Sequence, residues 1–298
     1  MPVLRSVFYI PGNKEDMIAK APKITADVIT LDLEDSVPPA EKDKARELTH
    51  KNLKMVAATG ADVYVRLNNW ETGMTNADCE AVVDEGLNAV CLAKCGGADD
   101  VKRLAWKLEE MEQKRGLKPG SIQIQLLIET AKGMMNVYGA AMASPRVNSL
   151  IFGAVDYTKD MRVDLIQPNG HEQDWARARM ACAARTAGII AIDCPYVAFK
   201  DTEGFEKDTR YGRQLGFEGR MLIHPSQIAP SHAIYSPSPE RLVWAKAVVK
   251  VFEEEGIAKG SAAVTLDGHM VDTPVYMNAL QILDTSKQIE EKEKQRAA

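Results

Sequence analysis

Short runs of apolar and β-branched residues recur from residue 3 to residue 228, and most are separated by a helix-length stretch of mixed polar and apolar residues. There are eight runs, at residues 3–10, 27–32, 62–67, 89–94, 122–128, 147–152, 189–192 and 220–223. Parallel strands need crossover connections of about this length, so the alternation predicts βα units. Eight such units predict an α/β fold, a (β/α)8 TIM barrel, over residues 1–230.

Side chains with catalytic or metal-binding chemistry stand at or just beyond the C-terminal end of nearly every predicted strand. They are Pro11, Gly12, Asn13, Asp32, Glu34, Asp35, Arg66, Lys94, Glu129, Asp156, Asp193 and His224. Barrel enzymes carry their active site at this end of the strands. The pattern therefore predicts an enzyme. A long polar stretch over residues 156–173 is predicted as a loop at the same end, either one that holds ligand or a tolerated surface insertion.

Residues 231–298 follow the predicted barrel, and we expect a C-terminal helical extension and lid there. Ser238 and Pro239 are typical of a helix start, and the apolar spacing predicts a helix over about residues 240–255. Beyond a breaker at residues 256–261 we expect an extended piece, a turn at Asp267-Gly268 and a further helix. This part is too small and too poor in apolar residues to fold as a domain. It is therefore expected to act as a lid or as an arm on a neighbouring subunit, with residues 287–298 solvated and frayed.

The bulk composition limits the possible partners. The 298 residues carry a formal net charge of −5 and no basic stripe, so nothing in the charge favours nucleic acid. No apolar stretch reaches the roughly 18 residues of a membrane-spanning helix, and no signal-peptide core precedes the first strand. Five cysteines without a C-x-x-C motif fit a reducing compartment, which predicts a cytoplasmic protein. Cys91 and Cys95 form either a metal pair or, as we favour, two semi-buried thiols.

Two acidic residues, Glu129 and Asp156, follow adjacent predicted strands and would point into the same barrel mouth. Two carboxylates together with water and substrate oxygens make a magnesium site. Because two like charges are costly to bury together, a divalent cation is the natural way to keep both ionised. The alternative is a structural pair of salt-bridged carboxylates. We expect Mg²⁺ at this pair.

Arg66 follows the apolar alternation of the third predicted strand, where a guanidinium could hold a substrate carboxylate or an enolate oxygen. Its alternative is an ordinary surface salt bridge. Asp32, Glu34 and Asp35 place three carboxylates within four residues, enough to orient metal-bound water or to accept hydrogen bonds from Arg66. One of the three could instead cap the next helix.

Nine motifs in chain order carry a resemblance that spans nearly the whole sequence. They are SVFYIPGN at 6–13, LDLEDSV at 31–37, VRLN at 65–68, IET at 128–130, GAVDY at 153–157, AID at 191–193, LGFEGR at 215–220, IHPSQ at 223–227 and GHMVDTP at 268–274. Together they resemble the citrate lyase beta-subunit-like family of CoA-ester lyases. The fourth strand departs from many relatives, because Lys94 is kept while a proline and an acid around it are not. A Gly-x-Glu-Asp motif of many relatives reads Ala154-Val155-Asp156 here.

The resemblance implies a magnesium-dependent barrel, usually a homotrimer, that cleaves or forms a C–C bond in the CoA thioester of a small hydroxy-dicarboxylic or tricarboxylic acid. It implies that Glu129 and Asp156 bind magnesium and that Arg66 contacts substrate. It also implies proton transfer by Asp272 in the C-terminal lid, as in the malyl- and citramalyl-CoA lyase branches. The alternative for Asp272 is a simple cap on the helix that starts near Pro274.

The expected reaction is a retro-Claisen cleavage, which gives acetyl-CoA or another acyl-CoA and a 2-oxo acid. Magnesium would polarise the reacting oxygens and Arg66 would stabilise the enolate. Arg5, Lys14 and Lys20 are available for the CoA phosphates. Two other activities stay open: a malyl-CoA-type thioesterase, and the beta subunit of a citrate lyase complex that acts on an acyl-carrier-bound thioester. A pyruvate aldolase without CoA is a third, although such relatives usually lack the lid.

Overall fold

The computed structural model describes residues 2–164 and 170–297. The chain divides into two compact units, Val3–His232 and Ala233–Ala298. Part of the predicted loop over residues 156–173 lies outside the described residues. Helix α6 (Ala154–Asp160) occupies its start, and the 3-10 turn His171–Gln173 occupies its end. No helix among the described residues is long and apolar enough to span a membrane.

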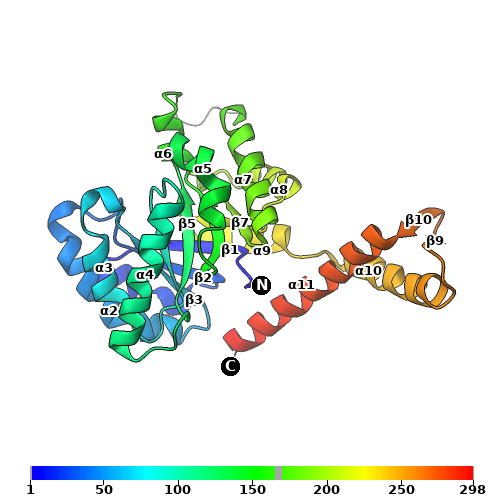
Figure 1. Ribbon diagram of the computed structural model, residues 1–298, viewed down its shortest axis with the longest axis horizontal. Helices are drawn as coiled ribbons and strands as arrows, with labels where there is room; N and C mark the ends of the chain where they lie inside the picture. The colour runs from blue at the N-terminus through cyan, green and yellow to red at the C-terminus, as the bar shows by residue number, and fades with distance from the viewer. Residues whose placement is uncertain (1, 165–169, 298) are drawn as a thin grey trace. The chain divides into compact units, whose positions relative to one another are not determined.

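The first unit is a closed barrel of eight parallel strands in chain order, which confirms the predicted fold (Figure 1). The strands are β1 (Ser6–Pro11), β2 (Val28–Asp32), β3 (Asp62–Leu67), β4 (Ala89–Leu92), β5 (Gln123–Ile128), β6 (Val147–Phe152), β7 (Ile190–Asp193) and β8 (Gly219–Leu222). Two predicted boundaries are wrong by more than one residue. The first strand begins at Ser6 and not at residue 3, and the fourth ends at Leu92 because Lys94 adopts a left-handed backbone conformation with φ 48°.

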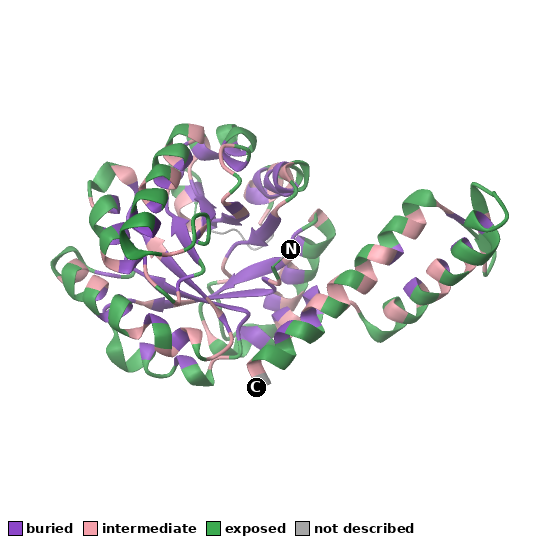
Figure 2. Cartoon of the chain, turned by 60° about the horizontal axis from the view of Figure 1, so that its bottom comes forward, coloured by how far each residue is buried: buried purple, intermediate pink, exposed green. Residues whose placement is uncertain are grey.

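Helices connect the strands and surround the barrel, so that buried strands lie inside a ring of helices with exposed outer faces (Figure 2). After α1 (Glu15–Ile18) come α2 (Lys42–Ala57), α3 (Thr75–Val82), α4 (Ala98–Arg115), α5 (Ala131–Ala141), α6, α7 (Asp174–Ala187), α8 (Thr202–Leu215) and α9 (Ile228–Tyr235). Helix α7 is followed by its C-cap Gly188, which lies in the left-handed region at φ 70°, where a residue without Cβ has no steric cost.

Apolar side chains from all eight strands fill the barrel interior. The cluster consists of Leu4, Val7, Val28, Tyr64, Ala89, Cys91, Ala93, Leu127, Ile151, Ile190, Ile192 and Met221, with half-buried Tyr9 packed against it. The strand register aligns the C-terminal ends: Asp32 pairs with Arg66 between β2 and β3, and Ile128 pairs with Phe152 between β5 and β6. This alignment brings the polar residues at the strand ends to one mouth.

The second unit has a small apolar core of its own. It contains α10 (Pro239–Val251), a π-helical turn (Phe252–Ile257), a hairpin of β9 (Ala263–Leu266) and β10 (His269–Asp272), and α11 (Thr273–Ala297). The predicted cap is confirmed, because the Ser238 side chain accepts a hydrogen bond from the Arg241 amide. Asp267 and Gly268 form the predicted turn with positive φ angles of 50° and 79°.

One expectation for this second unit stays a prediction and one is wrong. Ala245, Val248, Phe252, Val271 and Ala279 form a buried cluster, and the expectation that the unit cannot fold by itself stays a prediction. The segment expected to be frayed is helical as far as Ala297. Its run of Lys, Glu and Gln residues favours helix, and this propensity outweighs the tendency of a terminus to fray.

Candidate active site at the barrel mouth

The polar residues of the barrel mouth come from the ends of four neighbouring strands. Asp32 ends β2 and Arg66 lies on β3, while Lys94 and Glu129 follow β4 and β5. Asp156 lies in the first turn of α6, directly after β6. The structure therefore places the predicted Arg66, Glu129 and Asp156 at the same end of the barrel as the acidic cluster.

Arg66 forms a two-point ion pair with Asp32. Its Nε and Nη2 atoms donate to the two carboxylate oxygens at 2.6 Å each, and the side chains of Arg66 and Asp32 are only 12% and 2% exposed. The guanidinium also stands 5.2 Å from the centre of the Tyr9 ring. Burial alone would raise the pKa of Asp32, but the charge and hydrogen bonds of Arg66 outweigh it and hold that pKa below its usual value. The predicted interaction between Arg66 and the acidic cluster is thus present.

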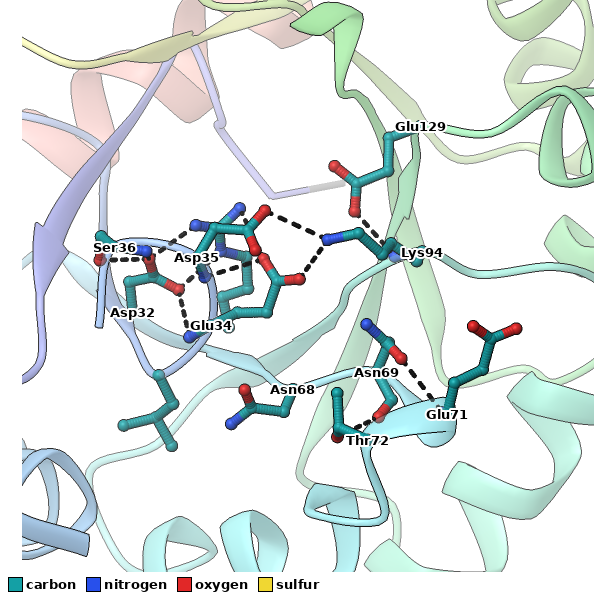
Figure 3. Close-up of polar contacts among 12 residues, drawn as sticks. Asp32, Glu34, Asp35, Ser36, Asn68, Asn69, Glu71, Thr72, Lys94 and Glu129 are labelled. Atoms are coloured by element: carbon teal, nitrogen blue, oxygen red, sulfur yellow. Dashed lines mark hydrogen bonds and ion pairs between the residues drawn. The ribbon is translucent and has the colours of Figure 1, made fainter. Parts of the chain in front are cut away.

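Lys94 links the rest of the acidic cluster. Its ammonium donates to Glu34 and, at 3.1 Å, to Asp35 (Figure 3). Arg66 also approaches Glu34 at 3.4 Å. Burial opposes the charged form of Lys94, but the surrounding carboxylates outweigh it and raise the pKa of this lysine. None of the three acids caps the next helix, since Glu41 occupies the N-cap position of α2, so the capping alternative is wrong.

Glu129, directly after β5, is a buried carboxylate at 2% exposure. Its Oε1 accepts a hydrogen bond from the Lys94 backbone amide at 2.8 Å. Burial raises the pKa of Glu129 to about 8, although the charges of Arg66 and Lys94 oppose the shift and Asp156 adds to it. Gly153 makes room for this side chain, because a Cβ at residue 153 would lie 2.6 Å from Glu129 Oε2.

Glu129 and Asp156 are suited to a magnesium ion. The buried carboxyl of Glu129 resists ionisation, and the negative charge of Asp156 makes it resist further, so a divalent cation would relieve both effects. Among residues 2–164 and 170–297, no group of three or more His, Cys, Asp or Glu side chains is placed to hold a metal. Two carboxylates would leave the other positions to water and substrate oxygens, which is the arrangement magnesium favours.

The prediction that Arg5 contacts substrate is corrected by its position. It precedes β1, so it lies at the opposite end of the strands from the mouth. It is 3% exposed, and its guanidinium donates to both oxygens of Asp27, with Nε 2.9 Å from Oδ2 and Nη2 3.0 Å from Oδ1. Lys14, at the N-cap of α1, and Lys20 are exposed and lie beyond the C-terminal end of β1. Their contact with CoA phosphates stays a prediction.

Other strand-end residues have structural partners. Asp193 at the end of β7 pairs with the buried Arg177, and His224 caps the short turn Pro225–Gln227 and stacks on Phe199 with ring centres 4.8 Å apart. Cys91 and Cys95 are buried, and the described part of the chain offers them no third metal ligand.

Sequence reasoning missed the connecting function of Lys94, the ring of Tyr9 beneath Arg66, and the steric requirement at Gly153. Lys94 was recognisable as a strand-end residue, but its left-handed backbone and its contact with Glu129 depend on the packing of β4 beside β5. Nothing in the sequence pattern indicates the contact of the Tyr9 ring with Arg66 or the steric requirement at Gly153.

Asp272 ends β10 in the second unit and is half-buried. Its Oδ1 accepts a hydrogen bond from the Val275 amide at 3.1 Å, so the carboxylate caps α11. The capping alternative for this residue is therefore present in the structure. Proton transfer by Asp272 stays a prediction.

Comparison with known proteins extends this picture to the family level. Residues 5–225 match the sequence pattern described as HpcH/HpaI aldolase/citrate lyase. The chain belongs to the HpcH/HpaI aldolase/citrate lyase family. It is a lyase of this family, and the resemblance noted in the nine motifs is confirmed.

Individual members of the HpcH/HpaI family align over nearly the full chain. The citrate lyase subunit beta of Leuconostoc mesenteroides subsp. cremoris is 35% identical over 279 residues, covering 94% of this chain and 92% of the relative. A (3S)-malyl-CoA thioesterase of Cereibacter sphaeroides is 33% identical, covering 96% and 95%. The crystal structure of CitE from Mycobacterium tuberculosis in complex with magnesium, acetoacetate and coenzyme A has a TM-score of 0.75 at 28% identity, covering 95% of this chain and 97% of CitE.

Proposed function

We propose that this protein is a magnesium-dependent C–C lyase that acts on a 3-hydroxy-carboxyacyl-CoA thioester by a retro-Claisen mechanism. The reaction would give acetyl-CoA, or another acyl-CoA, and a 2-oxo acid, and could run in either direction. The observation that carries the proposal is the mouth itself, where Glu129 and Asp156, after β5 and β6, and the Arg66–Asp32 pair, on β3 and β2, share the C-terminal end of one barrel.

Glu129 and Asp156 would hold the metal ion. When bound, magnesium supplies a Lewis acid that polarises the oxygens of the substrate. The Lys94 amide orients the Glu129 carboxylate, and Gly153 leaves the space that this carboxylate needs. Asp32 holds Arg66 in a fixed plane, so that its guanidinium can stabilise negative charge on an enolate oxygen without a reorganisation cost. Asp272 is the proposed proton-transfer group, supplied by the second unit.

The relatives support a CoA thioester as the substrate class. The neighbour from Mycobacterium tuberculosis was crystallised with magnesium and coenzyme A, and one relative acts on malyl-CoA by name. We further propose that Lys14 and Lys20 contact the CoA phosphates, that the chain assembles as a homotrimer, and that it acts in the cytoplasm.

Two sets of relatives each favour a competing activity. The malyl-CoA thioesterase indicates hydrolysis of the same kind of thioester, and the citrate lyase beta subunit indicates a thioester presented by an acyl-carrier partner. Hydrolysis leaves free CoA and an intact hydroxy acid, whereas C–C cleavage leaves acyl-CoA and a 2-oxo acid. The products therefore separate the two reactions.

The decisive experiment incubates the purified protein and magnesium with malyl-, citramalyl-, β-methylmalyl- and citryl-CoA, and identifies the products by mass spectrometry. The proposal expects acyl-CoA and a 2-oxo acid from at least one substrate, with no turnover in EDTA. Free CoA with intact hydroxy acid would identify the activity as that of a thioesterase and would overturn the lyase proposal. Turnover of a carrier-bound thioester with no turnover of any CoA thioester would identify the subunit of a complex.

A further inference from the structure

Lys94 contacts the acidic side chains of the site through two groups, its backbone amide and its side-chain ammonium. Its backbone amide donates to Glu129 Oε1 at 2.8 Å, and its ammonium contacts Glu34 and Asp35 (Figure 3). The left-handed backbone at φ 48° turns the amide toward Glu129 while the side chain extends to the acidic cluster. One residue therefore links the proposed metal ligand Glu129 to the acidic cluster of Glu34 and Asp35.

The two basic residues of the mouth differ in how easily they can change partners. Arg66 is committed to Asp32 through two hydrogen bonds, and the Asp32 side chain is 2% exposed. The Lys94 side chain is 28% exposed, and its contact with Asp35 is to a carboxylate that is 54% exposed. Ion pairs between exposed groups contribute little, because water screens them and replaces either partner. Lys94 can therefore release Asp35 at small cost, whereas Arg66 cannot release Asp32.

We propose that Lys94 is a substrate-binding residue, whose ammonium leaves Asp35 and binds the carboxylate of the 2-oxo acid portion of the substrate, next to the metal held by Glu129. The inference rests on the proposed function and adds to it the residue that binds this carboxylate. Glu34 remains in contact with the ammonium throughout, because the Glu34 side chain is 4% exposed and holds the lysine from the interior side. Asp35 and the substrate carboxylate therefore compete for the same contact with the Lys94 ammonium.

The test measures the binding of pyruvate, a 2-oxo acid with one carboxylate, by calorimetry on the full chain in saturating magnesium. Lys94→Met keeps the backbone amide and the length of the side chain but removes the charge. It should retain magnesium affinity while losing about tenfold to a hundredfold in pyruvate affinity, the value of a charge-assisted hydrogen bond. Asp35→Asn should change pyruvate affinity in the opposite direction, with a gain of up to about fivefold, because the competing carboxylate is gone.

A double variant separates competition from a general change in charge. Glu71→Gln is the matched control, because it also removes one exposed acid, and Figure 3 shows Glu71 on the far side of Asn69 from the acidic cluster. In the Lys94→Met background, Asp35→Asn should gain no more pyruvate affinity than Glu71→Gln gains in the wild type. If Lys94 only braced the loop, Lys94→Met and Asp35→Asn would weaken pyruvate binding together.

The inference is overturned if Lys94→Met binds pyruvate like the wild type, or if both single variants weaken binding. A wild-type chain that binds magnesium and cleaves a thioester, but shows either result, would lose only this inference. A wild-type chain that binds neither magnesium nor pyruvate would overturn the proposed function, and the inference with it, before any variant is compared.

Discussion

Gly153 offers a way to displace the proposed metal ligand without touching it. Its φ of −97° is open to any residue, so alanine meets only a steric obstacle there. The added Cβ would lie 2.5 Å from Glu129 Cβ and 2.6 Å from Oε2. The carboxylate oxygen must retreat by roughly 0.8 Å to reach ordinary contact at 3.4 Å, which exceeds the tolerance of about 0.5 Å that a binding site allows.

Magnesium demands near-ideal geometry with oxygens at about 2.0–2.1 Å, so this displacement should weaken its binding. We expect Gly153→Ala to lose about tenfold to a hundredfold in magnesium affinity by calorimetry, or about 1.4–2.7 kcal/mol. Overpacking should also cost about 1–3 kcal/mol of stability.

Gly139→Ala is the matched control, because a Cβ at this position in α5 has no atom within 4 Å. It should leave magnesium affinity unchanged and stabilise the helix by about 0.5–1 kcal/mol. Magnesium affinity at the wild-type level in Gly153→Ala would refute the reasoning, because Glu129 could then not be the ligand that the steric argument displaces.

Three further predictions follow from the same geometry. Arg66→Lys keeps the charge but not the two-point contact with Asp32, so kcat/KM should fall at least about tenfold with little change in Tm, and an unchanged kcat/KM would reduce Arg66 to a structural ion pair. Asp272→Asn still caps α11, so a turnover loss of about a hundredfold at constant Tm would show proton transfer. Asp272→Asn chains co-assembled with Glu129→Gln chains should regain activity if the lid crosses between subunits. No recovery in verified mixed oligomers would mean that each lid serves its own barrel. The raised pKa of Glu129, about 8, makes its ionisation costly to the folded state, so the Tm of metal-free protein should fall relative to Glu129→Gln as pH rises from 5 to 8, and parallel curves would contradict the burial argument.

The barrel was predictable because its evidence is local and repeated. Each strand contributes an apolar run of period two or a continuous buried run, and each crossover has helix length. Since all the barrel strands are parallel, the residues at their C-terminal ends meet at one mouth, and this alone predicts that Arg66, Glu129 and Asp156 lie at the same end of the barrel. The turn at Asp267-Gly268 was predictable for a similar reason, because this dipeptide favours positive φ at both turn positions.

The errors have equally physical causes. The apolar pattern predicts a first strand that begins three residues before β1 does and includes Arg5. Arg5 instead precedes β1 and pairs with Asp27 at the other end of the barrel. The contacts of Lys94 depend on one backbone angle and on the packing of neighbouring strands. The space beside Gly153 depends on the packing of β5 against β6. Side-chain periodicity carries none of this information.

The most direct test of the account is magnesium calorimetry on the wild type, Glu129→Gln and Asp156→Asn, after each chain has been cleared of metal with EDTA. The account predicts one magnesium ion per wild-type chain, and a loss of binding in both variants while each keeps its circular dichroism spectrum. Wild-type magnesium affinity in either variant would contradict the claim that Glu129 and Asp156 hold the ion together.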